Sequence, residues 1–298
     1  MVKTAFIFPG QGGQFVGQGL AFLDRDHILE DLFDLAEEIS GLPLQKISLE
    51  GPASLLSRTD VLQPAVLTLS MALAKITLNQ GAVPCLAAGH SLGEYGALWL
   101  AGVLTERETL TLVSARAKIM QKAAEAKPGA MAAIVKLPAE ETVKICELAS
   151  AMGIIAPANF NTPFQVVVSG EAAAVAAAGR YAKMKGGVSM VLPVSGAFHS
   201  PLMAGAAREM EQLLAEADFK KPAFPVVPNV TGEKETDPGR LKELLARQMT
   251  APVCWTKTVS VLEAENLTEI IECWPKLYTG ALTAKCLPDK RTAIRPAA

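Results

Sequence analysis

The sequence predicts an α/β fold with a larger and a smaller subdomain, and three observations support this prediction. Half of the 298 residues are hydrophobic and 19% are charged, which allows one well-buried core and a second small unit. Short apolar runs of strand length alternate with helical segments along most of the chain. Between residues 130 and 193 the alternation changes to the order β-α-β-β-α-β, which predicts a unit with a sheet of its own.

The first part of the chain predicts one strand–helix alternation after another. Residues 3–8 form an apolar run that Pro9 and Gly10 end. Thr105 and Glu108 match a capping box, so a helix is expected to begin there and to reach about residue 126. The other expected elements are a loop over 9–19, an amphipathic helix over 27–39, a buried helix over 64–79, a strand over 84–88 and a helix from 91 to about 100.

The middle of the chain carries the β-α-β-β-α-β order, which is the ferredoxin-like pattern. The strands are expected over 130–135, 154–159, 165–169 and 188–193, and the helices over 139–152 and 171–185. We therefore predict a smaller subdomain over 128–194, inserted into a catalytic subdomain formed by 1–127 and 195–298. The alternative is that these strands continue the main sheet.

The last part of the chain returns to the earlier alternation. A helix is expected over 202–217 and a strand near 225–230, followed by further helices and short strands. The polar, proline-containing tail over 289–298 is expected to be loosely held.

Composition excludes several classes of function. A net charge of -2 without a cluster of basic residues argues against nucleic-acid binding. The five cysteines are scattered and odd in number and there are only three histidines, so we expect free thiols, a reducing compartment and no metal site. The N-terminal apolar run is too short for a signal peptide, and the longest apolar stretch, 66–78, contains Lys75 and is too short to span a membrane. These features predict a cytoplasmic protein with no membrane association.

The strongest local signal for chemistry is the run Gly89-His90-Ser91-Leu92-Gly93, which fits the G-x-S-x-G nucleophile elbow. A nucleophilic serine there lies on a strained turn between a strand and a helix, with its hydroxyl exposed. The flanking glycines let neighbouring backbone pass closely, and the N-terminus of the following helix favours a developing oxyanion. An apolar run before Ser91 and a helical pattern after it agree with this interpretation.

A serine nucleophile needs a base, and the chain offers His27, His90 and His199. His27 begins an acidic, surface-like helix, and His90 is adjacent to the serine on a turn where neighbouring side chains point apart. His90 is therefore expected to line the substrate site or to be structural. His199 lies where a strand ends and a helix begins, so it is the candidate base by elimination.

Arg116 is a third feature, because it lies in an apolar stripe of the helix that begins at Thr105. A buried guanidinium is unfavourable unless an anion pairs with it, and its planar geometry suits a substrate carboxylate. The alternative is an arginine whose stem packs against the core while its head reaches water.

These residues resemble the malonyl-CoA:acyl carrier protein transacylase family, which includes the acyltransferases of polyketide synthases. The likeness covers roughly residues 3 to 285. The motifs that carry it are Phe8-Pro9-Gly10-Gln11-Gly12-Gly13-Gln14, Gln63-Pro64-Ala65, the elbow with Glu94-Tyr95, Arg116 with Met120-Gln121, Gly196-Ala197-Phe198-His199-Ser200, Asn229-Val230, and Gln248 with Pro252-Val253 and Trp255.

The resemblance implies an α/β-hydrolase-like larger subdomain with a ferredoxin-like insert, and it implies roles for the matching residues. Ser91 would be the nucleophile and His199 its base, oriented by the backbone carbonyl of Gln248. Arg116 would pair with the malonyl carboxylate.

Four further residues receive roles from the same resemblance. Gln11 and the backbone N–H of Leu92 would form the oxyanion hole, and Gln63 would support the site. Leu92 and Phe198 look like the pattern of malonyl-selective members, because a bulky Phe198 should crowd an α-methyl branch.

The implied reaction is a ping-pong transfer through a malonyl-serine ester, from malonyl-CoA to the phosphopantetheine thiol of an acyl carrier protein. Malonyl-CoA would be a substrate, and no cofactor is expected. A monomer is expected.

The sequence departs from the family pattern near the C-terminus, where Cys273-Trp274-Pro275-Lys276-Leu277 replaces a G-P-G turn. This change leaves the packing of that segment open. Three rival interpretations are a serine hydrolase, a polyketide or malonate-decarboxylase acyltransferase, and a non-catalytic relative. A hydrolase usually has an acidic residue between serine and histidine, for which the chain offers no well-placed candidate.

Overall fold

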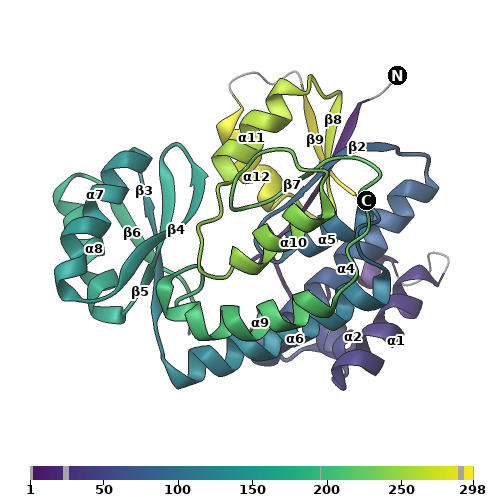
Figure 1. The fold of residues 1–298 in the computed structure, drawn as a ribbon, viewed down its shortest axis with the longest axis horizontal. Coiled ribbons are helices and arrows are strands. Elements are labelled where there is room, and N and C mark those ends of the chain that lie inside the picture. Colours follow the sequence, from purple (N-terminus) through teal and green to yellow (C-terminus); the bar gives the residue numbers. More distant parts are fainter. Residues whose placement is uncertain (1–2, 23–26, 195, 288–291, 298) are drawn as a thin grey trace.

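The structure is a computed structural model that describes residues 3–22, 27–194, 196–287 and 292–297. It contains two sheets, each with its own helices, in two units that lie side by side (Figure 1). The smaller unit is teal and lies to the left in this view, and the larger unit contains both the N-terminal and the C-terminal segments. The chain is therefore a mixed α/β protein, as its sequence predicts.

The larger unit is built on a parallel sheet of order β7-β2-β1-β8-β9. Its strands are β1 (Thr4–Phe8), β2 (Pro84–Gly89), β7 (Val226–Val227), β8 (Glu269–Glu272) and β9 (Ala293–Pro296). All five residues of β1 are buried, because helices cover both faces of the sheet. The strand expected near 225–230 is only two residues long.

Helices surround this sheet on both faces (Figure 1). They are η1 (Leu20–Phe22), α1 (Ile28–Ser40), α2 (Leu44–Glu50), α3 (Ala53–Leu56), α4 (Thr59–Asn79), α5 (Gly93–Leu100), α6 (Glu106–Ala126), η3 (Pro201–Met203), α9 (Ala204–Glu216), α10 (Pro238–Arg247), α11 (Trp255–Ala264) and α12 (Thr279–Cys286). The capping box before α6 is confirmed, since the Thr105 hydroxyl accepts from Glu108 N and the Glu108 carboxylate accepts from Thr105 N.

Helix α4 begins at Thr59, five residues before the predicted start at residue 64. The predicted range begins at Pro64, but the helix continues through this proline, which has no N–H and so donates no backbone hydrogen bond. Of the described helices, α4 alone is long and apolar enough to cross a membrane by length and composition, and 89% of its most apolar window is buried inside the protein. That burial is typical of a core helix.

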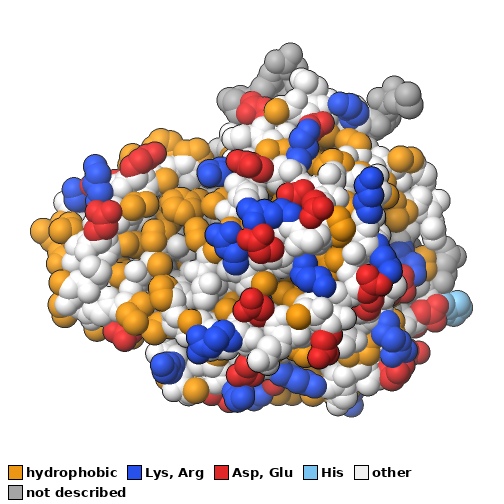
Figure 2. All heavy atoms as spheres, in the orientation of Figure 1, with side chains coloured by type: hydrophobic (Ala, Val, Ile, Leu, Met, Phe, Trp, Pro, Cys, Tyr) orange, Lys and Arg blue, Asp and Glu red, His pale blue; other side chains and the backbone are white. Residues whose placement is uncertain are grey.

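The smaller unit contains β3 (Ala130–Val135), α7 (Ala139–Ala149), η2 (Ser150–Met152), β4 (Ile155–Thr162), β5 (Gln165–Gly170), α8 (Ala172–Met184) and β6 (Val188–Val191). Its sheet is antiparallel and has the order β4-β5-β3-β6. The two helices α7 and α8 pack on each other and on one face of the sheet. Figure 2 shows a broad hydrophobic area on this unit, whereas basic and acidic side chains are intermixed over the larger unit.

Strand β4 joins the two units through its contacts with Val253, just before α11. Phe160 N donates to Val253 O at 2.9 Å, and Val253 N donates to Ala158 O at 2.8 Å. His90 adds a side-chain link, since its Nε2 lies 2.8 Å from Asn161 Oδ1 on β4. The units are thus tied together beside Ser91, where a substrate site is expected.

The tail was predicted to be loosely held, and this prediction is wrong for residues 293–297. Strand β9 pairs in parallel with β8, and Ala297 is fully buried against helix α4, whose Thr77 hydroxyl donates to Ala297 O at 2.9 Å. The polar composition misled the prediction, because β9 is held by backbone pairing with β8 while none of its four side chains is buried. Residues 289–291 and 298 lie outside the described residues.

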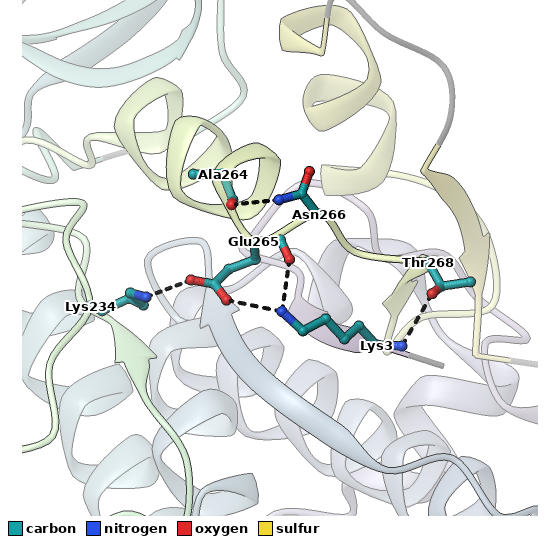
Figure 3. Close-up of polar contacts among 6 residues, drawn as sticks. All are labelled: Lys3, Lys234, Ala264, Glu265, Asn266 and Thr268. Carbon is teal, nitrogen blue, oxygen red and sulfur yellow. Dashed lines mark hydrogen bonds and ion pairs between the residues drawn. The ribbon is translucent and has the colours of Figure 1, made fainter. Parts of the chain in front are cut away.

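Exposed ion pairs tie the start of the chain to the turn between α11 and β8 (Figure 3). Glu265 accepts from Lys234, and Lys3 Nζ donates to the Glu265 backbone oxygen at 3.1 Å. The Lys3 backbone N–H also donates to Thr268 Oγ1 at 3.2 Å. Such exposed pairs contribute little to the free energy of unfolding.

Candidate active site

Ser91 lies on the turn between β2 and α5 and has a φ of 50°, in the left-handed region that strains a serine. Only glycine fits at the two flanking positions. A Cβ on Gly89 would lie 1.9 Å from the Gly93 carbonyl carbon, and a Cβ on Gly93 would lie 2.2 Å from Phe8 O. The close packing of β2, α5 and β1 therefore forces the turn and exposes the serine hydroxyl, as the elbow motif requires.

His199 accompanies Ser91, with Nε2 2.8 Å from Ser91 Oγ. Its other ring nitrogen, Nδ1, lies 2.9 Å from Gln248 O and 3.2 Å from Ala251 O. Backbone carbonyls only accept, so Nδ1 carries the proton and Nε2 presents its lone pair to the serine. This is the tautomer that a general base needs, and two carbonyls orient it without a carboxylate.

The environment keeps His199 neutral. Burial, followed by the positive charge of Arg116, lowers the pKa of His199 to about 3. The residue also has a positive φ of 57°, and its side chain is 4% exposed. A neutral imidazole is ready to accept the serine proton at any ordinary pH.

Arg116 on α6 is buried, with a relative exposure of 1%. Nη1 donates to Gln63 Oε1 at 2.6 Å, and Nη2 donates to Gln248 Oε1 at 3.0 Å and to Ser91 Oγ at 3.2 Å. Its Nε is buried without a partner in the described part of the chain. The guanidinium thus lies beside the nucleophile with neutral partners only, and burial lowers its pKa. The alternative in which the head reaches water is wrong.

Gln11 and Leu92 lie at the same pocket and offer backbone donors. Within the described ranges, neither the Gln11 N–H nor the Leu92 N–H has a hydrogen-bond partner. Two free N–H groups beside a serine hydroxyl suit an oxyanion, and Leu92 also precedes the first turn of α5, whose dipole adds to the effect.

The segment that departs from the family pattern packs on the loop that carries Gln11. Tyr278 OH donates to Gln11 O and Trp274 Nε1 donates to Gly13 O, each at 3.3 Å. Gly12 has a φ of 118°, and a Cβ there would lie 2.1 Å from Tyr278 OH. Trp274 in this segment and Tyr278 just after it thus place two aromatic side chains against the loop.

The cavity beside Ser91 has a volume of about 90 Å³. Polar and apolar side chains from both units line it. Phe198, only 5% exposed, forms part of the apolar wall. The lining residues are Gln11, Gln63, His90, Ser91, Leu92, Arg116, Met120, Met131, Asn159, Leu192, Val194, Phe198 and His199.

His90 lines this cavity but does not contact the Ser91 hydroxyl. Its Nε2 faces the Asn161 side-chain oxygen, and its ring lies 5.6 Å from the Trp255 ring, centroid to centroid. Burial lowers its pKa, so it is a neutral wall residue that links the two units. Of the three histidines, the structure brings His199 alone to the serine.

Sequence reasoning missed a carboxylate beneath the elbow. Glu94 on α5 is 1% exposed, and its Oε2 accepts from Gln248 Nε2 at 2.7 Å and from Asn229 N at 3.0 Å. The Asn229 side chain in turn accepts from Ser91 N at 2.6 Å and donates to Gly89 O at 2.5 Å. An acid in the apolar run after the elbow is the signal that sequence reasoning had available.

The Gln248 side chain also belongs to the site, in addition to the backbone carbonyl that was expected to orient His199. Its amide bridges Arg116 and Glu94 and donates to Ser91 O at 3.0 Å. Among residues 3–22, 27–194, 196–287 and 292–297, no group of three or more His, Cys, Asp or Glu side chains could hold a metal ion.

Comparison with known proteins agrees with this geometry. The sequence pattern of the acyl transferase domain family matches residues 5–275. A malonyl CoA-acyl carrier protein transacylase of Salmonella typhimurium is 40% identical over 296 residues, which are 98% of this chain and 95% of that protein.

Two solved structures have the same fold. An acyl carrier protein S-malonyltransferase from Vibrio cholerae superposes with a TM-score of 0.93 at 37% identity, covering 98% of this chain and 96% of that chain. A malonyl-transacylase in complex with its type II polyketide synthase acyl-carrier protein gives a TM-score of 0.94 at 34% identity, covering 99% of this chain and 95% of that chain. The family resemblance predicted from the motifs is therefore confirmed.

Proposed function

The chain belongs to the acyl transferase domain family, and on that premise we propose that it transfers a malonyl group from malonyl-CoA to the phosphopantetheine thiol of an acyl carrier protein. One observation carries this proposal. A buried arginine, whose hydrogen bonds in the described residues go to Gln63, Gln248 and Ser91 and not to a carboxylate, donates to the hydroxyl of a serine that is already paired with a neutral histidine. This combination suits an acyl group that brings its own carboxylate.

The first half-reaction acylates Ser91. His199 Nε2 takes the hydroxyl proton as Ser91 Oγ attacks the thioester carbonyl carbon of malonyl-CoA. The N–H groups of Gln11 and Leu92 stabilise the negative oxygen of the tetrahedral intermediate. When the C–S bond breaks, the proton on His199 passes to the leaving thiolate, and a malonyl-serine ester remains.

The second half-reaction repeats these steps with the carrier. The phosphopantetheine thiol gives its proton to His199 and attacks the ester carbonyl, and Ser91 Oγ recovers the proton as the ester C–O bond breaks. Arg116 holds the malonyl carboxylate in both halves, with Gln63 and Gln248 fixing the guanidinium plane. A neutral acyl group leaves that charge unpaired, so it is disfavoured.

The wall of the cavity suits an unbranched malonyl group. Phe198 and Leu92 line a space of about 90 Å³, and a methyl branch at the α-carbon would meet the Phe198 ring. Selection against branched acyl groups would then be steric, whereas selection against uncarboxylated groups is electrostatic.

The fold assignment that accompanies this function is an α/β-hydrolase-like subdomain over 1–127 and 195–298 with a ferredoxin-like subdomain over 128–194. The parallel sheet that presents Ser91 after β2 supports the first part. The antiparallel order β4-β5-β3-β6, with two helices on one face, supports the second. Transfer of an acyl group from a thioester to a thiol through a serine ester needs no cofactor. A cytoplasmic monomer without membrane association remains the expectation.

The resemblance to a malonyl-transacylase bound to a polyketide carrier favours a second candidate, in which the acceptor is a polyketide synthase carrier protein. The chemistry at Ser91 is unchanged in that case. A serine hydrolase has less support, because His199 is oriented by the carbonyls of Gln248 and Ala251. The developing imidazolium thus lacks the carboxylate that hydrolases usually place there.

Intact mass measurement tests the proposal. Incubation with malonyl-CoA alone should add one malonyl group to the wild-type protein, and Ser91→Ala should remove the adduct. A holo carrier protein should then take the malonyl group from the isolated adduct. Absence of an adduct with accumulation of free malonate would support a hydrolase instead, and absence of both would overturn the proposal.

A further inference from the structure

Glu94 is a buried carboxylate that the mechanism above does not use. It lies on α5, three residues after the nucleophile, and is 1% exposed. Both of its hydrogen bonds converge on one oxygen, Oε2, while Oε1 is buried without a partner among the described residues. No Lys, Arg or His of the described chain forms an ion pair with it. A charge buried in this way is energetically unfavourable, so its presence at this position needs a physical reason.

The amide of Gln248 supplies that reason, because Glu94 determines how the amide points. Gln248 Nε2 donates to Glu94 Oε2 at 2.7 Å and to Ser91 O at 3.0 Å. Both partners accept and neither donates. The opposite edge of the amide, Oε1, is therefore directed at Arg116 Nη2, 3.0 Å away.

A flipped amide would be unfavourable at both ends. Its oxygen would face the Glu94 carboxylate and the Ser91 carbonyl, and its NH₂ group would face the guanidinium. Two acceptor–acceptor contacts and one donor–donor contact would replace three hydrogen bonds. Glu94 thus fixes the orientation of the Gln248 amide, and the amide in this orientation keeps the Arg116 guanidinium directed at Ser91.

We propose that Glu94 is a positioning residue of the transfer reaction, which acts through the Gln248 amide to hold the Arg116 guanidinium where it receives the carboxylate of the acyl group. This inference rests on the proposed malonyl transfer and goes beyond it, because it assigns acyl selectivity to a residue that does not touch the substrate. Gln248 then orients two residues of the site. Its main-chain oxygen orients His199, and its side chain orients Arg116.

A purely structural role is the competing explanation, since Glu94 Oε2 also accepts from the Asn229 backbone N–H. In that case a substitution would lower stability and total activity, but the choice between acyl groups would not change. The discriminating quantity is therefore the ratio of the Kd values for acetyl-CoA and malonyl-CoA, measured in a Ser91→Ala background so that no acylation interferes.

Two variants of Glu94 separate the hydrogen bond from the rest of the side chain. Glu94→Met removes the acceptor at nearly the same volume, which frees the amide, and should lower the preference for malonyl-CoA at least tenfold at pH 8. Glu94→Gln keeps an acceptor oxygen for Gln248 and Asn229, with its NH₂ at the unpartnered Oε1 position, and should keep the preference within threefold. An unchanged preference in Glu94→Met would overturn the proposal, and so would an equal loss in both variants.

Gln248→Met removes the amide that links Glu94 to Arg116 and keeps the main-chain oxygen that orients His199. It should lower the malonyl preference as Glu94→Met does, and the double variant should lose no more than either single one. Additive losses would show that Glu94 does not act through Gln248. If Glu94→Met does not fold, Gln248→Met alone decides, and an unchanged preference there overturns the proposal.

Measurements on the wild-type protein distinguish a failure of this inference from a failure of the proposed function. Wild-type protein that forms no malonyl adduct refutes malonyl transfer before any variant of Glu94 is compared. Wild-type protein that forms the adduct, together with a Glu94→Met variant of unchanged acyl preference, refutes the positioning role alone.

Discussion

Replacing Arg116 with methionine removes the guanidinium while keeping an unbranched side chain in the apolar stripe of α6. In the proposed complex the malonyl carboxylate accepts two charge-assisted hydrogen bonds from Nη1 and Nη2, or from Nη2 and the unpartnered Nε. Each such bond contributes about 1.5–3 kcal/mol, so the pair is worth about 3–6 kcal/mol. Because each 1.36 kcal/mol is a factor of ten, kcat/KM for malonyl-CoA should fall by roughly 10² to 10⁴.

The same substitution should improve transfer of an acetyl group. The positive charge of Arg116 contributes to the low pKa of His199, so its removal makes the imidazole a stronger base. It also removes a buried charge that an acetyl group leaves unpaired. The expected signature is therefore opposite changes for the two substrates, not a general loss.

The assay is the rate of acyl-enzyme formation by rapid-quench mass measurement, with malonyl-CoA and acetyl-CoA in parallel. Arg107→Met is a matched control, because Arg107 lies on the same helix but forms an exposed pair with Glu38. It should change neither rate by more than about twofold. Equal losses for malonyl-CoA and acetyl-CoA in Arg116→Met would refute the assignment of Arg116 to the carboxylate.

Two further predictions concern groups around the reacting atoms. Burial raises the pKa of Glu94 from 4.5 to about 7, so its contribution to stability is full below pH 4.5 and is lost as the pH rises through 7. Relative to wild type, Glu94→Gln should therefore gain about 3 kcal/mol of unfolding free energy between pH 4.5 and pH 8, measured in urea, and a constant difference would contradict this. Tyr278→Phe removes the hydrogen bond to Gln11 O, which is worth about 1 kcal/mol, and should slow acylation about fivefold without changing malonyl-CoA binding to the Ser91→Ala protein. Tyr181→Phe on α8 is the control, and equal rates in the two tyrosine variants would show that the hydroxyl does not position the loop.

The reactive pair, Ser91 and His199, could be predicted from features of the sequence alone. Ser91 lies between two glycines that no other residue can replace, and a short strand precedes it. His199 was identified as the candidate base by elimination among three histidines. Arg116 stood out as a charge in an apolar stripe, and its burial agrees with that pattern.

Other parts of the site depend on contacts between segments that are distant in the sequence, and no local sequence feature indicated these contacts. The Gln248 amide lies 157 residues from the Ser91 carbonyl that it contacts, and Asn229 lies 138 residues from the same serine. Glu94 had a weak signal, as an acid within an apolar helix, but nothing in its surroundings in the sequence indicated its partners. Tyr278 directly follows the segment whose departure from the family pattern was noted, and its contact with Gln11 appears only when the chain folds.

The fold shows the same division between local and distant information. The capping box predicted the start of α6, whereas the helix predicted over 64–79 begins five residues earlier, at Thr59. The tail is polar, yet β9 is held by the exposed edge of β8 and by Thr77 on α4. Neither partner is visible from the tail sequence itself.

The arrangement of charges suggests how recognition and reactivity are coupled in this site. In the free protein, burial and then the positive charge of Arg116 lower the pKa of His199, so the imidazole is a weak base. A malonyl carboxylate that pairs with Arg116 offsets that positive charge, and the basicity of His199 should then rise toward its ordinary value. An acetyl group brings no such charge and leaves the base weak. Arg116 therefore contributes to selectivity twice, because the carboxylate that binds it also favours proton transfer from Ser91.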